Sequence, residues 1–165
     1  MYTIATPSQC TTWLADRAIE AHPYGKPLAA SLNYQRVGVE KSDAYGDFVG
    51  QHVATLSTGE PALLQMQDWS AYGDASLPAP LIALQRVSSG TFDAPGVEFD
   101  GHSPAELAAC CAFIVNHGQT AYLYLAGHRI TALFWEGEFI ELWGQSAHLV
   151  NSIANALGQD RLRPA

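Results

Sequence analysis

Hydrophobic and polar positions follow a helical spacing near the N-terminus of the chain. Thr6 and Pro7 give a capping residue followed by a proline, and Pro23 and Gly25 stop the pattern. The apolar positions between them are Trp13, Leu14, Ala18 and Ile19. This spacing predicts an amphipathic helix that opens the fold.

A second helical pattern runs from Ser103 to Gly118. Ser103, Pro104 and Glu106 form the pattern of a capping box with a proline in the first turn, and Gly118 stands where a left-handed residue ends a helix. The apolar positions of this helix are Leu107, Cys110, Cys111, Ile114 and Val115. A third pattern begins at the cap Ser146 and is expected to end at Gly158. Pro78 and Pro80 favour a short helix over LPAPLIALQRV, with a strand as the alternative.

Alternating apolar and polar residues predict strands in the rest of the chain. Such runs cover residues 32–39, QHVATLS at 51–57 and PALLQMQDW at 61–69. Three further runs fill residues 120–144, separated by Ala126-Gly127 and Glu136-Gly137 in the manner of two tight hairpins. TFDAPGVEFDG is expected to be a turn-rich connection.

Together these elements predict an α+β fold, an antiparallel sheet with helices packed against it, in the order α-β-β-β-α-α-β-β-β-α. The last five elements form a C-terminal α-β-β-β-α module. A length of 165 residues is typical of a single domain, residues 1–165.

Composition and charge limit the kinds of partner. The chain is 48% hydrophobic and 15% charged, which favours an ordered globule, and its net charge is −8. Residues 40–106 account for the whole excess, with ten acids against two bases. Because no basic patch is available to bind phosphates, we expect a basic protein partner and no nucleic acid. With no leader pattern, no apolar run long enough to span a membrane, and an odd number of cysteines, we expect a cytoplasmic protein.

Several candidate chemistries are weak in this sequence. Cys110 and Cys111 are adjacent and fall on the apolar helix face, which indicates core residues and no redox or metal pair. The six histidines show no metal-ligand spacing, and no glycine-rich phosphate loop occurs, so we expect no metal and no cofactor. Glu136, Glu138 and Glu141 are expected to be solvated hairpin charges.

One stretch suggests an enzyme. The sequence QCTTW resembles the start of CHAP-type cysteine amidases, in which a cysteine lies near the start of a helix. The resemblance implies a triad of Cys10, a histidine on a following strand, which His52 supplies, and an orienting polar residue, for which Asp68 or Glu60 would serve; we take Asp68 as the candidate. A thiol amidase or peptidase is therefore the alternative function.

Another stretch suggests binding without catalysis. MQDWSAYGDASLP carries Trp69 and Tyr72 between Asp68 and Asp74, which is the mixture of aromatic anchors and acidic rim typical of a protein-recognition patch. The stretch KSDAYGDF repeats it with Tyr45 between Asp43 and Asp47. These seven residues are the candidate partner-binding set.

The C-terminal two-thirds resembles a group of small bacterial α+β proteins. The features that carry the resemblance are LLQMQDWSAYG after a strand, the capped helix, a strand of the form AYL and a closing hairpin that ends in an aromatic. In size and acidity the chain also resembles the immunity proteins of bacterial toxin systems. That resemblance implies a non-enzymatic protein that occludes the active site of a cognate toxin.

Overall fold

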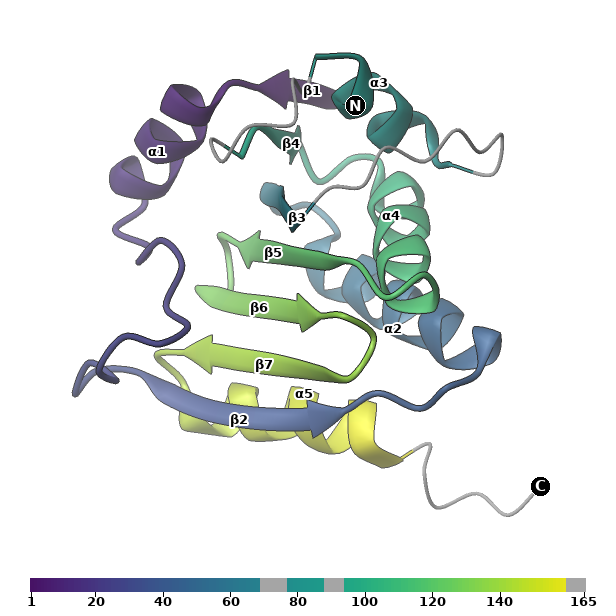
Figure 1. Cartoon of the computed structure of the whole chain (residues 1–165). Coiled ribbons are helices and arrows are strands. Elements are labelled where there is room, and N and C mark those ends of the chain that lie inside the picture. The colour runs from purple at the N-terminus through teal and green to yellow at the C-terminus, as the bar shows by residue number, and fades with distance from the viewer. Residues whose placement is uncertain (69–76, 88–93, 160–165) are drawn as a thin grey trace.

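A seven-stranded antiparallel sheet forms the centre of the protein. The computed structural model describes residues 1–68, 77–87 and 94–159. The strands are β1 (Tyr2–Ala5), β2 (Asn33–Gly38), β3 (Ala62–Asp68), β4 (Gly96–Phe99), β5 (Thr120–Leu125), β6 (Ile130–Trp135) and β7 (Phe139–Gly144). Their order across the sheet is β1-β4-β3-β5-β6-β7-β2, and each neighbouring pair is antiparallel (Figure 1). The two strands nearest the N-terminus therefore form the two edges.

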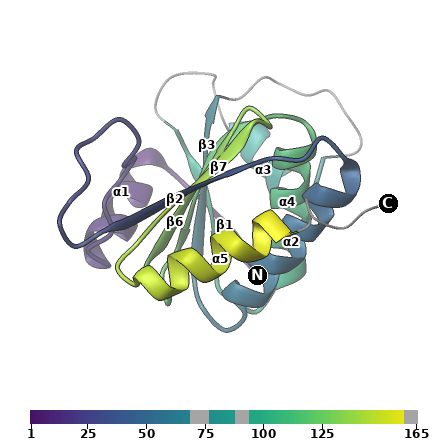
Figure 2. The same cartoon turned by 90° about the horizontal axis from the view of Figure 1, so that it is seen from below.

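Helices cover the two faces of the sheet unequally. The helices are α1 (Pro7–Asp16), α2 (Asp43–Ser57), α3 (Ala79–Val87), α4 (Pro104–Asn116) and α5 (Ala147–Gln159). Figure 2 shows α1 on one side of the sheet with the irregular segment 17–32, which we call the strap, and α2 and α4 on the other. The first side is called the strap face and the second the helix face. No helix in the described parts of the chain is long and apolar enough to cross a membrane.

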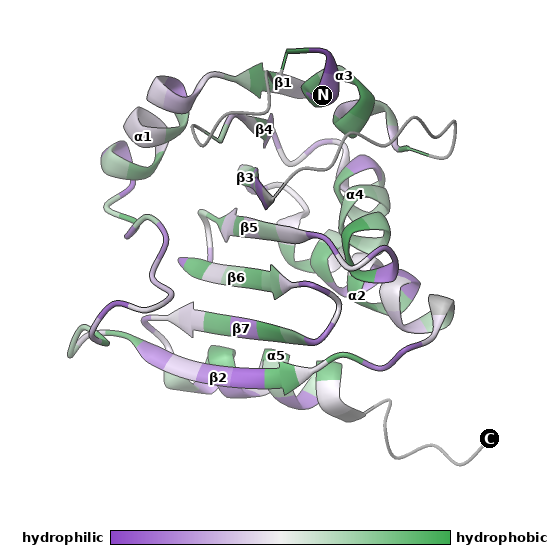
Figure 3. Cartoon of the chain, in the orientation of Figure 1, coloured by the Kyte–Doolittle hydropathy of each residue, from purple (hydrophilic) through white to green (hydrophobic). Residues whose placement is uncertain are grey.

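Strand alternation divides the core between these faces. Leu64 and Leu123 belong to the large cluster on the helix face, with the buried side chains of α2, α3, α4 and α5. Leu63, Tyr122 and Tyr124 belong to a smaller cluster on the strap face, with α1. Every residue of β5 is buried because both faces are covered. By contrast, the middle of the edge strand β2 is hydrophilic (Figure 3).

The predicted α+β class and the C-terminal α-β-β-β-α module are confirmed. The strand predicted for residues 51–57 is wrong, because these residues belong to α2. The hydroxyl oxygen of Ser42 accepts a hydrogen bond from the Tyr45 amide, and Tyr45, Val49 and Val53 then follow at helical spacing. β1 and β4 were not predicted. The first helix ends at Asp16, well before Pro23.

Two predicted helix ends also differ from the structure. The Ser103 side chain makes no capping bond to α4, and its hydroxyl instead accepts a hydrogen bond from the amino group of Met1, which also pairs with Asp100. The predicted capping box is therefore wrong. Gly158 does not end the last helix, since α5 continues to Gln159.

Candidate functional site

The predicted cysteine triad is not assembled. Cys10 packs on the strap face, whereas His52 lies on α2, the helix that covers the opposite face. Cys10 is fully buried, and burial raises the pKa of its thiol to about 11, although contact with Gln65 acts in the opposite direction. A thiol of this kind is a poor nucleophile at neutral pH. Asp68 ends β3, and its side chain lies outside the described part of the structure.

The His52 ring has a different environment from the one predicted. It is half-buried, stacks on Phe48 with ring centres 6.4 Å apart, and its buried Nε2 has no hydrogen-bond partner among the described residues. Burial lowers the pKa of His52. His52 therefore does not pair with Cys10 on the opposite face of the sheet.

The prediction that Tyr45 is a surface anchor is wrong, because only 1% of this residue is exposed and it belongs to the core on the helix face. Asp47 is exposed on α2. Trp69, Tyr72 and Asp74 lie outside the described residues, as does the side chain of Asp43.

The adjacent cysteines of α4 are core residues, as predicted. Cys110 and Cys111 are fully buried, and burial raises the pKa of both thiols. In the part of the chain that the structure describes, no group of three histidine, cysteine or acidic side chains could hold a metal ion.

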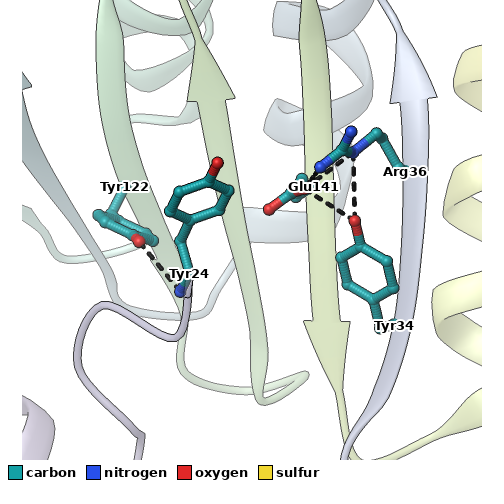
Figure 4. Close-up of polar contacts among 5 residues, drawn as sticks. All are labelled: Tyr24, Tyr34, Arg36, Tyr122 and Glu141. Atoms are coloured by element: carbon teal, nitrogen blue, oxygen red, sulfur yellow. Dashed lines mark hydrogen bonds and ion pairs between the residues drawn. The ribbon is translucent and has the colours of Figure 1, made fainter. Parts of the chain in front are cut away.

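A polar cluster that the sequence did not predict lies on the strap face. Glu141 in β7 is only 2% exposed, and its carboxylate accepts hydrogen bonds from the Tyr34 hydroxyl at 2.7 Å and from Nε of Arg36 at 2.8 Å (Figure 4). A second guanidinium nitrogen of Arg36 also bonds the same oxygen. Both partners come from β2, where Arg36 pairs in register with Glu141. Glu141 is thus the buried carboxylate of an ion pair and not a solvated hairpin charge.

The cluster perturbs the titration of both β2 side chains. Burial and the hydrogen bond to Glu141 raise the pKa of the Tyr34 hydroxyl. The hydrogen bond to Glu141 also raises the pKa of Arg36. Both groups therefore keep their protons at neutral pH and act as hydrogen-bond donors to Glu141.

Flat side chains are stacked beside this cluster. Tyr24 of the strap stacks on Trp135 with ring centres 5.1 Å apart, and Trp135 stacks on Phe139 at 5.9 Å with the two planes nearly parallel. The guanidinium carbon of Arg36 lies 4.3 Å from the centre of the Phe139 ring. These four residues form what we call the aromatic ladder. Its members are exposed or half-buried, and Tyr24 is 43% exposed.

Exposed carboxylates adjoin the ladder. Glu136 and Glu138 lie in the turn between Trp135 and Phe139 and are exposed. Glu40 follows β2 and, with Glu136, lines a pocket of about 310 Å³ between this turn and the end of α4, to which Lys41 contributes a basic side chain. The end of β2, the start of α2 and the β6–β7 turn lie at the same end of the sheet (Figure 1). Asp68 lies opposite Thr120, so β3 also ends there.

The sequence contained only a partial signal for this site. Tyr34 and Arg36 are two positions apart in a predicted strand and so lie on the same side of it. Trp135 and Phe139 flank a predicted turn. Their convergence depends on the pairing of β2 with β7, and 105 positions separate Arg36 from Glu141. Comparison with protein-family models, with curated proteins and with solved structures finds no significant match for this chain.

Proposed function

We propose that this chain is a binding protein for a basic protein partner, and that it acts as an immunity protein that neutralises a bacterial toxin by covering its active site. The observation that carries the proposal is the aromatic ladder beside the exposed carboxylates of the β6–β7 turn. We call this combination, Tyr24, Arg36, Trp135, Phe139, Glu40, Glu136 and Glu138, the binding face.

The composition of the binding face supports contact with a protein. Tryptophan, tyrosine and arginine are the residues that most often dominate the energy of protein interfaces. Trp135 and Arg36 are held by stacking on Phe139, so little side-chain freedom remains to be lost on binding. A preorganised ladder of this kind favours specific docking over loose adhesion.

The charge of the binding face supports a basic partner. Glu40, Glu136 and Glu138 are exposed, Lys41 beside them supplies one positive charge, and the charge of Arg36 is already matched by Glu141. The net charge of the whole chain, −8, has the same sign. Complementary charge accelerates the encounter of two proteins, whereas the buried aromatic contacts slow their dissociation.

A binding assay with any basic protein that is encoded beside this chain tests the proposal. We expect this neighbour to be toxic when expressed alone, and co-expression of the chain to restore growth. Replacing Trp135→Ala together with Glu136→Lys should weaken the Kd by about 30-fold or more, because an aromatic anchor and a matched charge are both lost. Calorimetry measures the Kd, and thermal unfolding checks that the variant remains folded.

Asp16→Lys serves as the control, since it also reverses an exposed carboxylate but lies on α1, outside the binding face. It should leave the Kd nearly unchanged. An unchanged Kd for the Trp135→Ala and Glu136→Lys variant would remove the binding face from the interface. A neighbour that is neither toxic nor bound would contradict the immunity function.

A further inference from the structure

The strap lies across the strap face and makes a small number of apolar contacts with it, among them the stack of Tyr24 on Trp135. Ile19 and Ala21 pack partly against the core there, and Pro23 is buried, whereas residues 24–31 are exposed throughout. A cavity of about 30 Å³ remains between the strap and the sheet, beside Thr131 and Trp143. A segment with so little buried apolar surface opens at low cost unless polar contacts hold it.

Those polar contacts gather around His22. The Tyr124 hydroxyl accepts a hydrogen bond from the His22 amide at 3.2 Å, and the Tyr122 hydroxyl accepts one from the Tyr24 amide at 3.3 Å (Figure 4 shows the second). The His22 ring packs on Tyr122 with centres 5.0 Å apart, and its Nε2 lies 3.3 Å from the amide nitrogen of Gln67. With the Gln67 amide in this orientation its nitrogen donates to Nε2, a contact that a neutral imidazole makes and an imidazolium does not.

The backbone of His22 is also strained. Its φ of 48° lies in the left-handed region, which residues other than glycine adopt in only a few per cent of cases. Strained residues persist only where the surrounding contacts hold them. The closed strap therefore depends on the hydrogen bonds and ring contact of His22.

The charges near His22 oppose its protonation. Burial lowers the pKa of His22 first, and the nearby Lys26 ammonium lowers it further, while contact with Gln65 acts in the opposite direction. Nζ of Lys26 lies 3.7 Å from Oε1 of Glu20, which is also in the strap. From β5, Tyr122 and Tyr124 face the ring, and burial raises the pKa of both hydroxyls, so they are neutral. Among the described residues that act on the His22 charge, none is acidic.

We propose that the strap is a proton-operated latch, in which protonation of His22 releases the strap from β3 and β5 and uncovers the tyrosines of the strap face. A protonated Nε2 can no longer accept from Gln67, and its charge faces Lys26 in a partly dry site. Opening places the imidazolium in water and lets the backbone leave the left-handed region. This device is a property of the chain alone and does not depend on the proposed function.

Hydrogen exchange of the unbound chain tests the latch. Peptides covering the strap should exchange several-fold faster, relative to intrinsic rates, at about pH 5.5 than at about pH 7.5, because protons bind more readily to His22 in the open strap than in the closed one. His22→Asn should abolish this pH dependence, since asparagine tolerates the left-handed region but does not titrate. His128→Asn, in the β5–β6 turn, is the matched control and should retain the response.

Two results would overturn the latch. One is strap exchange that is the same at both pH values, or that changes equally in His22→Asn and in the unaltered chain. The other is equal acceleration of the strap and α2, because protonation of His52 would then be unfolding the whole protein. Faster exchange confined to the strap and lost in His22→Asn supports the proposal.

Discussion

At the scale of single residues, Glu141 has the most demanding surroundings on the sheet. Its carboxylate is removed from water, and a buried charge is tolerated only where it is paired and hydrogen-bonded. Arg36 and Tyr34 supply that pairing from the edge strand. The buried charge of Glu141 is therefore compensated when β2 pairs with β7 in the correct register.

Removing only the cationic partner should destabilise the protein. We expect Arg36→Met to lower the thermal unfolding midpoint by several degrees, because the methionine still covers Phe139 but leaves the Glu141 carboxylate buried without a positive partner. Replacing both residues with methionine should recover most of the loss, since no buried charge then remains. Circular dichroism measures the midpoints, and a double variant no more stable than Arg36→Met would contradict this explanation.

At the scale of elements, α2 and α4 make the closest helix contact in the fold. A side chain at Gly50 would place its Cβ only 2.4 Å from the backbone oxygen of Ala108, so glycine is needed there for space and not for conformation. At Gly158 in α5, no atom of the described residues beyond the adjoining helix backbone lies within 4 Å of such a Cβ. Close helix packing therefore requires glycine at Gly50 but not at Gly158.

The same substitution should consequently have opposite effects at these positions. Gly50→Ala should lower the free energy of unfolding by about 1–3 kcal/mol, because the helices must separate. Gly158→Ala should raise it by about 0.5–1 kcal/mol, because alanine loses less backbone entropy in a helix. Urea denaturation measures both values, and a neutral Gly50→Ala would show that α2 and α4 can move apart freely.

The elements also show how far sequence reasoning reaches. The hairpins of β5, β6 and β7 were predictable because turn residues separate strong apolar runs, and α4 because its apolar face is continuous. The strand prediction for residues 51–57 was wrong because Val53 and Thr55 favour strands, whereas the helical spacing of the apolar residues begins earlier, at Tyr45. β1 and β4 have four residues each and are stabilised by pairing with distant strands, which no local pattern reveals.

The functional residues were harder to predict than the fold for the same reason. The charge excess between residues 40 and 106 was visible, but the carboxylates Glu136 and Glu138 that adjoin the aromatic ladder lie outside that span. The ladder itself joins the strap, the edge strand β2 and the β6–β7 hairpin. Its existence depends on which strands become neighbours, and the strand order is a property of the whole chain.

At the scale of the whole molecule, the sheet separates two kinds of surface. The helix face is filled by four helices around the large core, whereas the strap face carries one short helix, the strap and the aromatic ladder. The aromatic ladder lies on the second surface, and the carboxylates of the binding face lie at the end of the sheet where β2 and β3 also end, with Glu40 and Glu136 next to the end of α4. We expect the partner to bind at this end of the sheet and to leave the exposed sides of α4 and α5 free.

Hydrogen exchange of the chain in complex with its basic neighbour, compared with the free chain, tests this claim most directly. Amides of residues 33–40 and 134–141 should be protected in the complex, while those on the exposed sides of α4 and α5 should exchange as they do in the free protein. Protection confined to the helix face, with the β6–β7 hairpin unchanged, would contradict the account.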